Sequence, residues 1–186
     1  MLGYEVTPDV NFYGRVATGY RSGGFNAQDP AVGGVLPSFR PESLTSYEAG
    51  LKSELFDRRV RLNLAGYYNE YKDLAITAPV ANAAQGTFAT QVLNAGKVTY
   101  AGVEAELAAV LNDNFTFEAN AGYVKVKFKE FNAGQPVNTS LPAVNIASFA
   151  KASYTSPVTA SAALNAQFPV GDKGMRVVGR VSYAYE

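Results

Sequence analysis

The sequence predicts an all-β protein: an antiparallel up-and-down meander of about seven to eight long strands that forms part of a transmembrane β-barrel. Three observations lead to this prediction. Apolar and polar residues alternate with a period of two over long stretches, no stretch shows the spacing of an amphipathic helix, and short and long connections alternate along the chain.

The composition excludes several functional classes. The 186 residues carry 16 basic and 16 acidic side chains, and 17% of residues are charged, against about 25% in a typical soluble domain. The chain has no Cys and no His, which excludes disulfides, thiolate metal ligands and a Ser-His-Asp triad. A net charge of zero argues against a nucleic-acid partner. We therefore expect neither an enzyme nor a cofactor-binding protein.

The predicted strands, in chain order, cover residues 1–6 (the tail of one strand), 10–20, 44–55, 60–72, 94–111, 115–128, 158–168 and 175–186. In 158–168 the apolar residues, Val158, Leu164 and Phe168 among them, occupy every even position, and the odd positions are mostly polar. In 60–72, Leu62 and Leu64 likewise alternate with polar neighbours. Such alternation places the two kinds of side chain on opposite faces of a strand.

The connections predict how the strands are arranged. Short turns fall at residues 7–9, 57–59, 112–114 and 171–174, and long connections at 21–43, 75–93 and 129–157. Because the two kinds alternate, all tight turns lie at one end of the sheet and all long loops at the other. Transmembrane barrels have this asymmetry, and strands of 11 residues or so are long enough to cross a bilayer at a tilt.

The apolar half of the alternation is predicted to face lipid and the polar half a lumen. The apolar half is rich in Val, Leu, Ala and Gly and ends in aromatic residues, whereas a charge on it would cost a few kcal/mol. Sorted by face, almost all charges fall into the lumen-facing half, the turns and the loops. The lumen-facing charges are Arg15, Glu48, Lys52, Arg61, Glu104, Glu106, Glu118 and Arg180.

Several segments in series resemble TonB-dependent outer-membrane receptors. They are YGRVATGYRSGGFN at 13–26, FRPE at 39–42, SYEAGLKSELFD at 46–57, RVRLNLA at 59–65, YNEYKDL at 68–74, NAGKV at 94–98 and GVEAEL at 102–107. The resemblance is strong over residues 10–128. Residues 158–169 and 175–186 share only the general character of a hairpin.

This resemblance implies a place and a function. Receptors of this kind have 22-stranded barrels closed by a plug, so residues 1–186 are expected to be a partial barrel domain, roughly a third of the wall. The plug, the segment that contacts TonB and the remaining strands are expected to lie outside it. The implied function is active uptake of scarce nutrients, such as ferric siderophores, across the outer membrane. The implied partners are outer-membrane lipid, a small-molecule substrate, the receptor's own plug and the TonB complex.

The candidate ligand-binding residues lie in the loops and on the lumen face. They are Arg21, Phe25, Phe39, Phe88 and Phe131 in the loops, and Tyr67, Tyr71 and Tyr100 on the lumen face. Phe149 is a further exposed loop aromatic. No catalytic or metal-binding residue is predicted.

Other interpretations remain open at this stage. The chain could be a small self-closing outer-membrane barrel that acts as a passive pore or anchor, or a soluble β-sandwich binding module. Glu104 and Glu106 could be an acid/base pair, although a lumen-facing charge ladder explains them. The arginines at 15, 61, 176 and 180 are expected to pair with wall or plug carboxylates. Gly23 and Gly24 are expected to form a turn in a loop.

Overall fold

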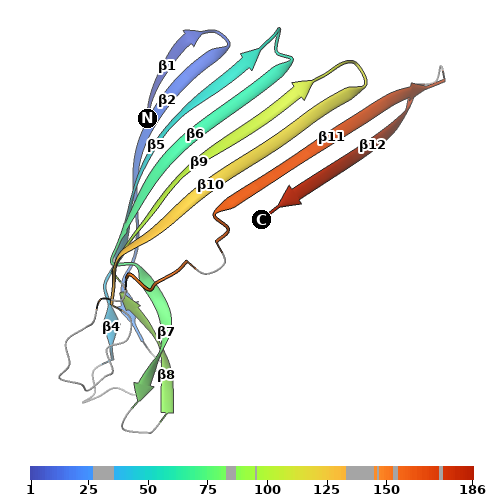
Figure 1. Ribbon diagram of the computed structural model, residues 1–186. Coiled ribbons are helices and arrows are strands. Elements are labelled where there is room, and N and C mark those ends of the chain that lie inside the picture. The colour runs from blue at the N-terminus through green and yellow to red at the C-terminus, as the bar shows by residue number, and fades with distance from the viewer. Residues whose placement is uncertain are drawn as a thin grey trace.

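A computed structural model describes residues 1–26, 36–82, 87–94, 96–132, 145, 147–152, 155–171 and 174–186. Eight long strands form one antiparallel sheet in which each strand pairs with the next long strand in the sequence (Figure 1). The strands are β1 (Leu2–Thr7), β2 (Val10–Arg21), β5 (Glu42–Leu55), β6 (Val60–Lys72), β9 (Gly96–Val110), β10 (Phe115–Phe131), β11 (Val158–Val170) and β12 (Met175–Tyr185). The predicted meander is therefore confirmed.

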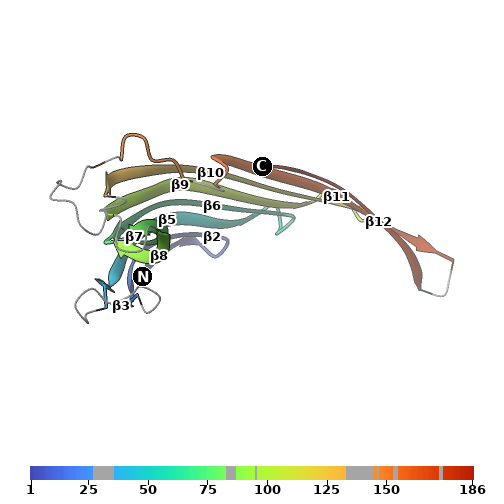
Figure 2. The ribbon, with the colours of Figure 1, turned by 90° about the horizontal axis from the view of Figure 1, so that it is seen from below.

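The sheet is a single curved layer, as Figure 2 shows from below. Strands β1 and β12 lie at its two edges, so the barrel is not closed by the described strands. No second sheet packs face to face on this layer in the described part of the chain, which removes the β-sandwich interpretation. Among the described residues, no helix is long and apolar enough to span a membrane.

The register keeps residues of one kind on one face over the whole sheet. Leu51 lies directly opposite both Phe12 and Leu64, and Val103 lies opposite Tyr123. Paired residues point to the same side of a sheet. Phe12, Leu51, Leu64, Val103 and Tyr123 therefore lie on one side, which we call the outward face. The other side, the lumen face, carries Tyr13, Arg15, Glu48, Lys52, Arg61, Asn63, Tyr67, Glu104, Glu106, Glu118 and Arg180.

No described residue covers the outward face. Val181 is 77% exposed and Tyr183 is 72% exposed, whereas Val98 is the only large side chain that is fully buried among the described residues. A water-soluble protein rarely leaves so large an apolar surface uncovered. The outward face is therefore suited to contact with lipid.

Two short hairpins lie at the end of the sheet opposite the tight turns (Figure 1). One pairs β3 (Gly24–Phe25) with β4 (Ser38–Phe39), and the other pairs β7 (Ala75–Asn82) with β8 (Thr87–Asn94). The sequence prediction treated both regions as long irregular connections and missed these strands. Gly23 and Gly24 do not form a simple turn, because Gly24 begins β3 and the Phe39 ring lies against it.

Candidate functional site

The lumen face is hollowed over β2, β5, β6 and β9. The hollow has a volume of about 620 Å³, and its lining includes Tyr13, Glu48, Tyr67, Tyr71, Tyr100 and Glu104. The Tyr13 hydroxyl donates a hydrogen bond of 2.8 Å to the Glu48 carboxylate. The lining therefore offers aromatic faces, hydroxyl groups and carboxylates to a solute in the lumen.

Two tyrosines of this lining lie over glycines of the neighbouring strand. Tyr13 pairs with Gly50, and Tyr67 pairs with Gly102. A Cβ atom added at Gly50 would lie 2.5 Å from the Tyr13 ring and 2.6 Å from the backbone oxygen of Leu64. Glycine is therefore needed there, because any side chain would displace the ring that shapes the hollow.

Tyr71 and Tyr100 line the part of the hollow that lies nearest the loops. Their rings meet edge to face, with centroids 5.6 Å apart and an interplanar angle of 68°. The side-chain oxygen of Asn69, in the same lining, is buried without a hydrogen-bond partner among the described residues. A buried acceptor of this kind favours a donor from a bound solute or water. The sequence analysis did not single out Asn69.

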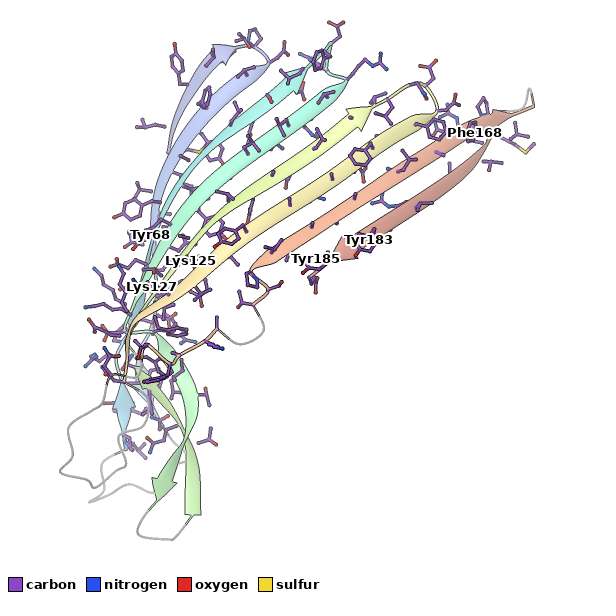
Figure 3. All side chains as sticks on the ribbon, viewed as in Figure 1. Tyr68, Lys125, Lys127, Phe168, Tyr183 and Tyr185 are labelled. Atoms are coloured by element: carbon purple, nitrogen blue, oxygen red, sulfur yellow. The ribbon has the colours of Figure 1, made fainter. Side chains whose placement is uncertain are left out.

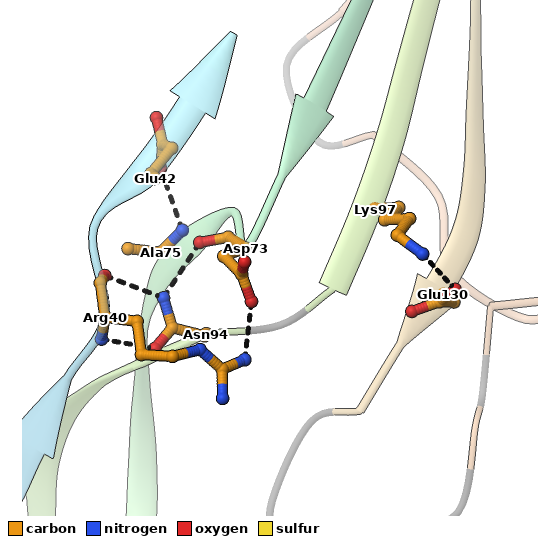
Figure 4. A network of polar contacts seen from close by, with 7 residues as sticks. All are labelled: Arg40, Glu42, Asp73, Ala75, Asn94, Lys97 and Glu130. Atoms are coloured by element: carbon orange, nitrogen blue, oxygen red, sulfur yellow. Dashed lines mark hydrogen bonds and ion pairs between the residues drawn. The ribbon is translucent and has the colours of Figure 1, made fainter. Parts of the chain in front are cut away.

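A network of polar contacts, drawn in Figure 4, ties the loops together at the end of the sheet. The Asn94 side chain accepts a hydrogen bond of 2.7 Å from the Arg40 backbone N–H. It also donates to the backbone oxygens of Arg40 and Asp73, at 3.0 and 2.8 Å. The Arg40 guanidinium forms an ion pair with the Asp73 carboxylate. Asn94 therefore holds the end of β8 against both preceding loops.

Arg21 and Glu42 extend this network across β2 and β5. The Arg21 guanidinium lies 2.8 Å from the Glu42 carboxylate and donates to the backbone oxygen of Ala75 at 2.8 Å. The same carboxylate accepts from the Ala75 backbone N–H at 2.8 Å. These contacts occupy the Arg21 side chain in fixing the start of β7. Its predicted role in ligand binding stays a prediction.

Asn26 docks one hairpin on the other. Its side-chain amide donates to the Val92 backbone oxygen at 3.1 Å and accepts from the Val92 N–H at 2.8 Å. The side chain thereby reproduces the hydrogen bonds of a neighbouring strand residue. Sequence reasoning missed Asn26, Asn94 and Glu42, because their partners lie up to 66 residues away in the sequence.

The structure separates the predicted loop aromatics into two groups. Phe25 is 69% exposed and Phe149 is 83% exposed, so both rings are free to meet a solute. The Phe131 ring instead packs edge to face against Phe128, at 5.2 Å between centroids, and Phe39 lies against Gly24. The side chain of Phe88 lies outside the described residues.

Among the described residues, one pair of lumen charges forms an ion pair. The Arg180 guanidinium lies 3.0 Å from the Glu118 carboxylate and donates to the Asn165 side-chain oxygen at 2.9 Å, so its predicted pairing with the wall is confirmed. Asn63 donates to Glu106 at 3.2 Å. No cluster of three or more potential metal ligands occurs among the described residues. The pairing of Arg15, Arg61 and Arg176 with carboxylates stays a prediction.

Comparison with known proteins shows which family this sequence matches. The sequence model of the TonB dependent receptor-like β-barrel matches residues 1–186. The pesticin receptor of Yersinia pestis is 32% identical over 127 residues, which is 68% of this chain and 17% of that protein. The pesticin receptor of Yersinia enterocolitica is 31% identical over the same length. The chain thus spans about a sixth of the length of these curated relatives.

Solved structures have the same fold. The crystal structure of the ferric yersiniabactin uptake receptor FyuA from Yersinia pestis superposes with a TM-score of 0.69 and 24% identity, over 98% of this chain and 24% of that one. The copper transporter OprC superposes with a TM-score of 0.62 and 15% identity, over 88% of this chain and 23% of that one. At these identities the structural likeness establishes the fold.

Proposed function

Because the chain belongs to the family of TonB-dependent receptor β-barrels, we propose that it forms wall strands and extracellular loops of an active importer of scarce nutrients, such as ferric siderophores. Members of this family are outer-membrane proteins, and the outer membrane is the location of this chain. They are transporters and not enzymes.

This proposal rests on one observation: one face of the sheet is polar and the other is apolar. The lumen face holds the hollow of about 620 Å³ with its tyrosines and carboxylates. The outward face is largely apolar, and side chains such as Val103, Val181 and Tyr183 on it are exposed to the surroundings. A wall between lipid and a water-filled passage requires this arrangement.

We propose that residues 1–186 are one part of a larger barrel domain. The open edges of the sheet at β1 and β12 support this, because unpaired edge strands need partners in a membrane. The fraction of the relatives that the chain covers supports it too. The remaining wall, the plug and the contact with TonB would then be supplied by other parts of the same receptor.

We propose that the substrate first meets the exposed loop aromatics and then the lumen hollow. Phe25 lies in the β3–β4 hairpin at the loop end of the sheet. Tyr71 and Tyr100 line the part of the hollow that lies nearest this end. The names of similar solved structures, which also include the ferric-catecholate import receptor Fiu from E. coli, suggest the first substrates to examine: ferric yersiniabactin, a ferric catecholate and copper.

Uptake by cells that carry the full-length receptor tests the proposal. Cells that lack other receptors would be given ferric yersiniabactin, a ferric catecholate or copper, each radioactively labelled, with and without a protonophore. We expect one ligand to accumulate only while the membrane is energised. Uptake that persists with the protonophore would support a passive pore and contradict the proposal.

The role of Phe25 can be tested in the same cells. Phe25→Ala removes an exposed ring at the loop end, and we expect about tenfold weaker binding of the transported ligand because aromatic contacts dominate recognition. Phe56→Ala is the matched control, since Phe56 is 75% exposed but lies in the tight turn at the opposite end. Equal affinities for the two variants would remove Phe25 from the ligand path.

A further inference from the structure

Two asparagines connect the β3–β4 hairpin to strand β8 in the same way. The Asn26 side chain, which follows β3, donates to the backbone oxygen of Val92 and accepts from its N–H, at 3.1 and 2.8 Å. The Asn94 side chain, at the end of β8, donates to the backbone oxygen of Arg40 and accepts from its N–H, at 3.0 and 2.7 Å (Figure 4). Each amide therefore pairs with both backbone groups of a single residue. We call these four residues the asparagine clasp.

The asparagine clasp holds both strands of the β3–β4 hairpin. Asn26 directly follows β3, and its backbone N–H donates to the Pro37 oxygen at 2.8 Å, next to the pair of Phe25 and Ser38. Arg40 directly follows β4. A hairpin that is bonded to β8 beyond both of its strands cannot turn about a single contact. Asn26 is only 8% exposed, so water competes little for its hydrogen bonds.

The wall strands alone do not fix the position of the β7–β8 hairpin. The ladder between β6 and β9 ends at the pair of Tyr71 and Val98. The chain leaves β6 through Asp73, with a φ of 54°, and enters β9 at Gly96, with a φ of 127°. Both values lie outside the extended region of a strand. The hairpin therefore does not continue the wall strands, and its position depends on contacts with the loops around it.

We infer that Asn26 and Asn94 are positioning residues that join the two hairpins into one rigid unit and thereby fix the position of Phe25. Asn94 bonds to the backbone of Arg40 and Asp73, so it acts on residue 25 only through the paired hairpins. A ligand that meets a ring already held in place has less ordering to supply on binding. The part of the inference that concerns ligand binding rests on the proposed function.

Distances between spin labels measure the position of residue 25 directly. Phe25→Cys and Lys127→Cys would be labelled in a full-length receptor without other cysteines. Lys127 is the reference because it lies on the wall strand β10, near the loop end (Figure 3). Pulsed electron resonance gives the distribution of distances between the two labels, without any ligand. We expect Asn94→Leu to make this distribution about twofold broader, because the β3–β4 hairpin would no longer be held at both strands.

The matched control breaks a similar contact at the other end of the sheet. The Asn114 amide also donates to a backbone oxygen, that of Gln167 at 2.8 Å, so Asn114→Leu should leave the distribution unchanged. A distribution that Asn94→Leu does not broaden, or that both variants broaden equally, would overturn the inference. Because no ligand is added, a receptor that imports no substrate would contradict only the proposed function.

A second variant removes one hydrogen bond of the clasp reversibly. In Asn26→Asp a carboxylate can accept from the Val92 N–H but cannot donate to the Val92 oxygen. Protonation at about pH 4, close to the ordinary pKa of an aspartic acid, supplies the missing donor. With labels at Thr90→Cys, which is exposed on β8, and Lys127→Cys, the distribution should be broad at pH 7 and narrower at pH 4. It should stay narrow at both values while Asn26 is present. A width that does not depend on pH in the variant would contradict the role of Asn26.

Discussion

Single glycines on the lumen face decide where the tyrosine rings can lie. Gly50 and Gly102 each accommodate a ring from the neighbouring strand, and in both cases a backbone oxygen closes the remaining space. Since a backbone atom cannot swing away as a flexible side chain can, the space at these positions is fixed by the sheet itself.

We expect Gly50→Val to destabilise the receptor by about 1–3 kcal/mol, the usual cost of forcing extra carbon into a packed site. The midpoint of thermal unfolding, followed by heat-dependent migration on a gel, measures the effect. Gly19→Val is the control, because nothing lies within 4 Å of a Cβ atom added at Gly19. Similar midpoints for the two variants would show that the Tyr13 ring is not held in place by Gly50.

Asn94 carries the largest set of contacts at the loop end. We expect Asn94→Leu to loosen the β7–β8 hairpin, because three hydrogen bonds of about 0.5–1.5 kcal/mol each are lost. Hydrogen exchange over β7 and β8 should become faster, while exchange over β10 stays unchanged. Asn120→Leu, which removes a single contact of 3.4 Å, serves as control. Unchanged exchange over the hairpin would mean that other contacts hold it.

At the scale of elements, the predicted faces of the strands have unequal tolerance for charge. Leu62 points outward and Asn63 points into the lumen. We expect Leu62→Arg to reduce the amount of receptor assembled in the outer membrane severely, because an arginine facing the bilayer core costs up to about 2–4 kcal/mol. Asn63→Arg should assemble normally. Equal assembly of the two variants, measured in membrane fractions, would mean that the faces are assigned wrongly.

The long strands could be predicted from the sequence and the short hairpins could not, for physical reasons. Alternation is a local property that each long strand displays by itself, as residues 60–72 do. Strand β7 contains Pro79, which cannot donate to a ladder and argues against a strand when the sequence is read alone. The contact of Asn26 with Val92 depends on loops that meet only in the folded molecule.

Lys125 and Lys127 illustrate information that was present in the sequence but missed. Both continue the phase of Tyr123, so the same alternation that placed the tyrosine outward places the lysines outward. A charge in phase with the apolar positions indicates the point where a strand leaves the bilayer core. No comparable local pattern in the sequence predicts how the loops lie relative to one another.

At the scale of the whole molecule, an open sheet with two different faces accounts for most of the properties of this chain. Zero net charge, few charged residues and the lack of Cys and His are compatible with a wall that separates lipid from a lumen. In the proposed barrel, the edge strands β1 and β12 would pair with further strands of the receptor.

The central claim is that one face of the sheet meets lipid and the other a water-filled lumen. Spin labels on single cysteines along β10, at Thr116, Ala119, Asn120 and Ala121 in a full-length receptor without other cysteines, test it most directly. In lipid bilayers, the outward labels at 119 and 121 should be accessible to oxygen, and the lumen labels at 116 and 120 to a water-soluble nickel complex. Accessibility that does not alternate, or alternates in the opposite sense, would contradict the account.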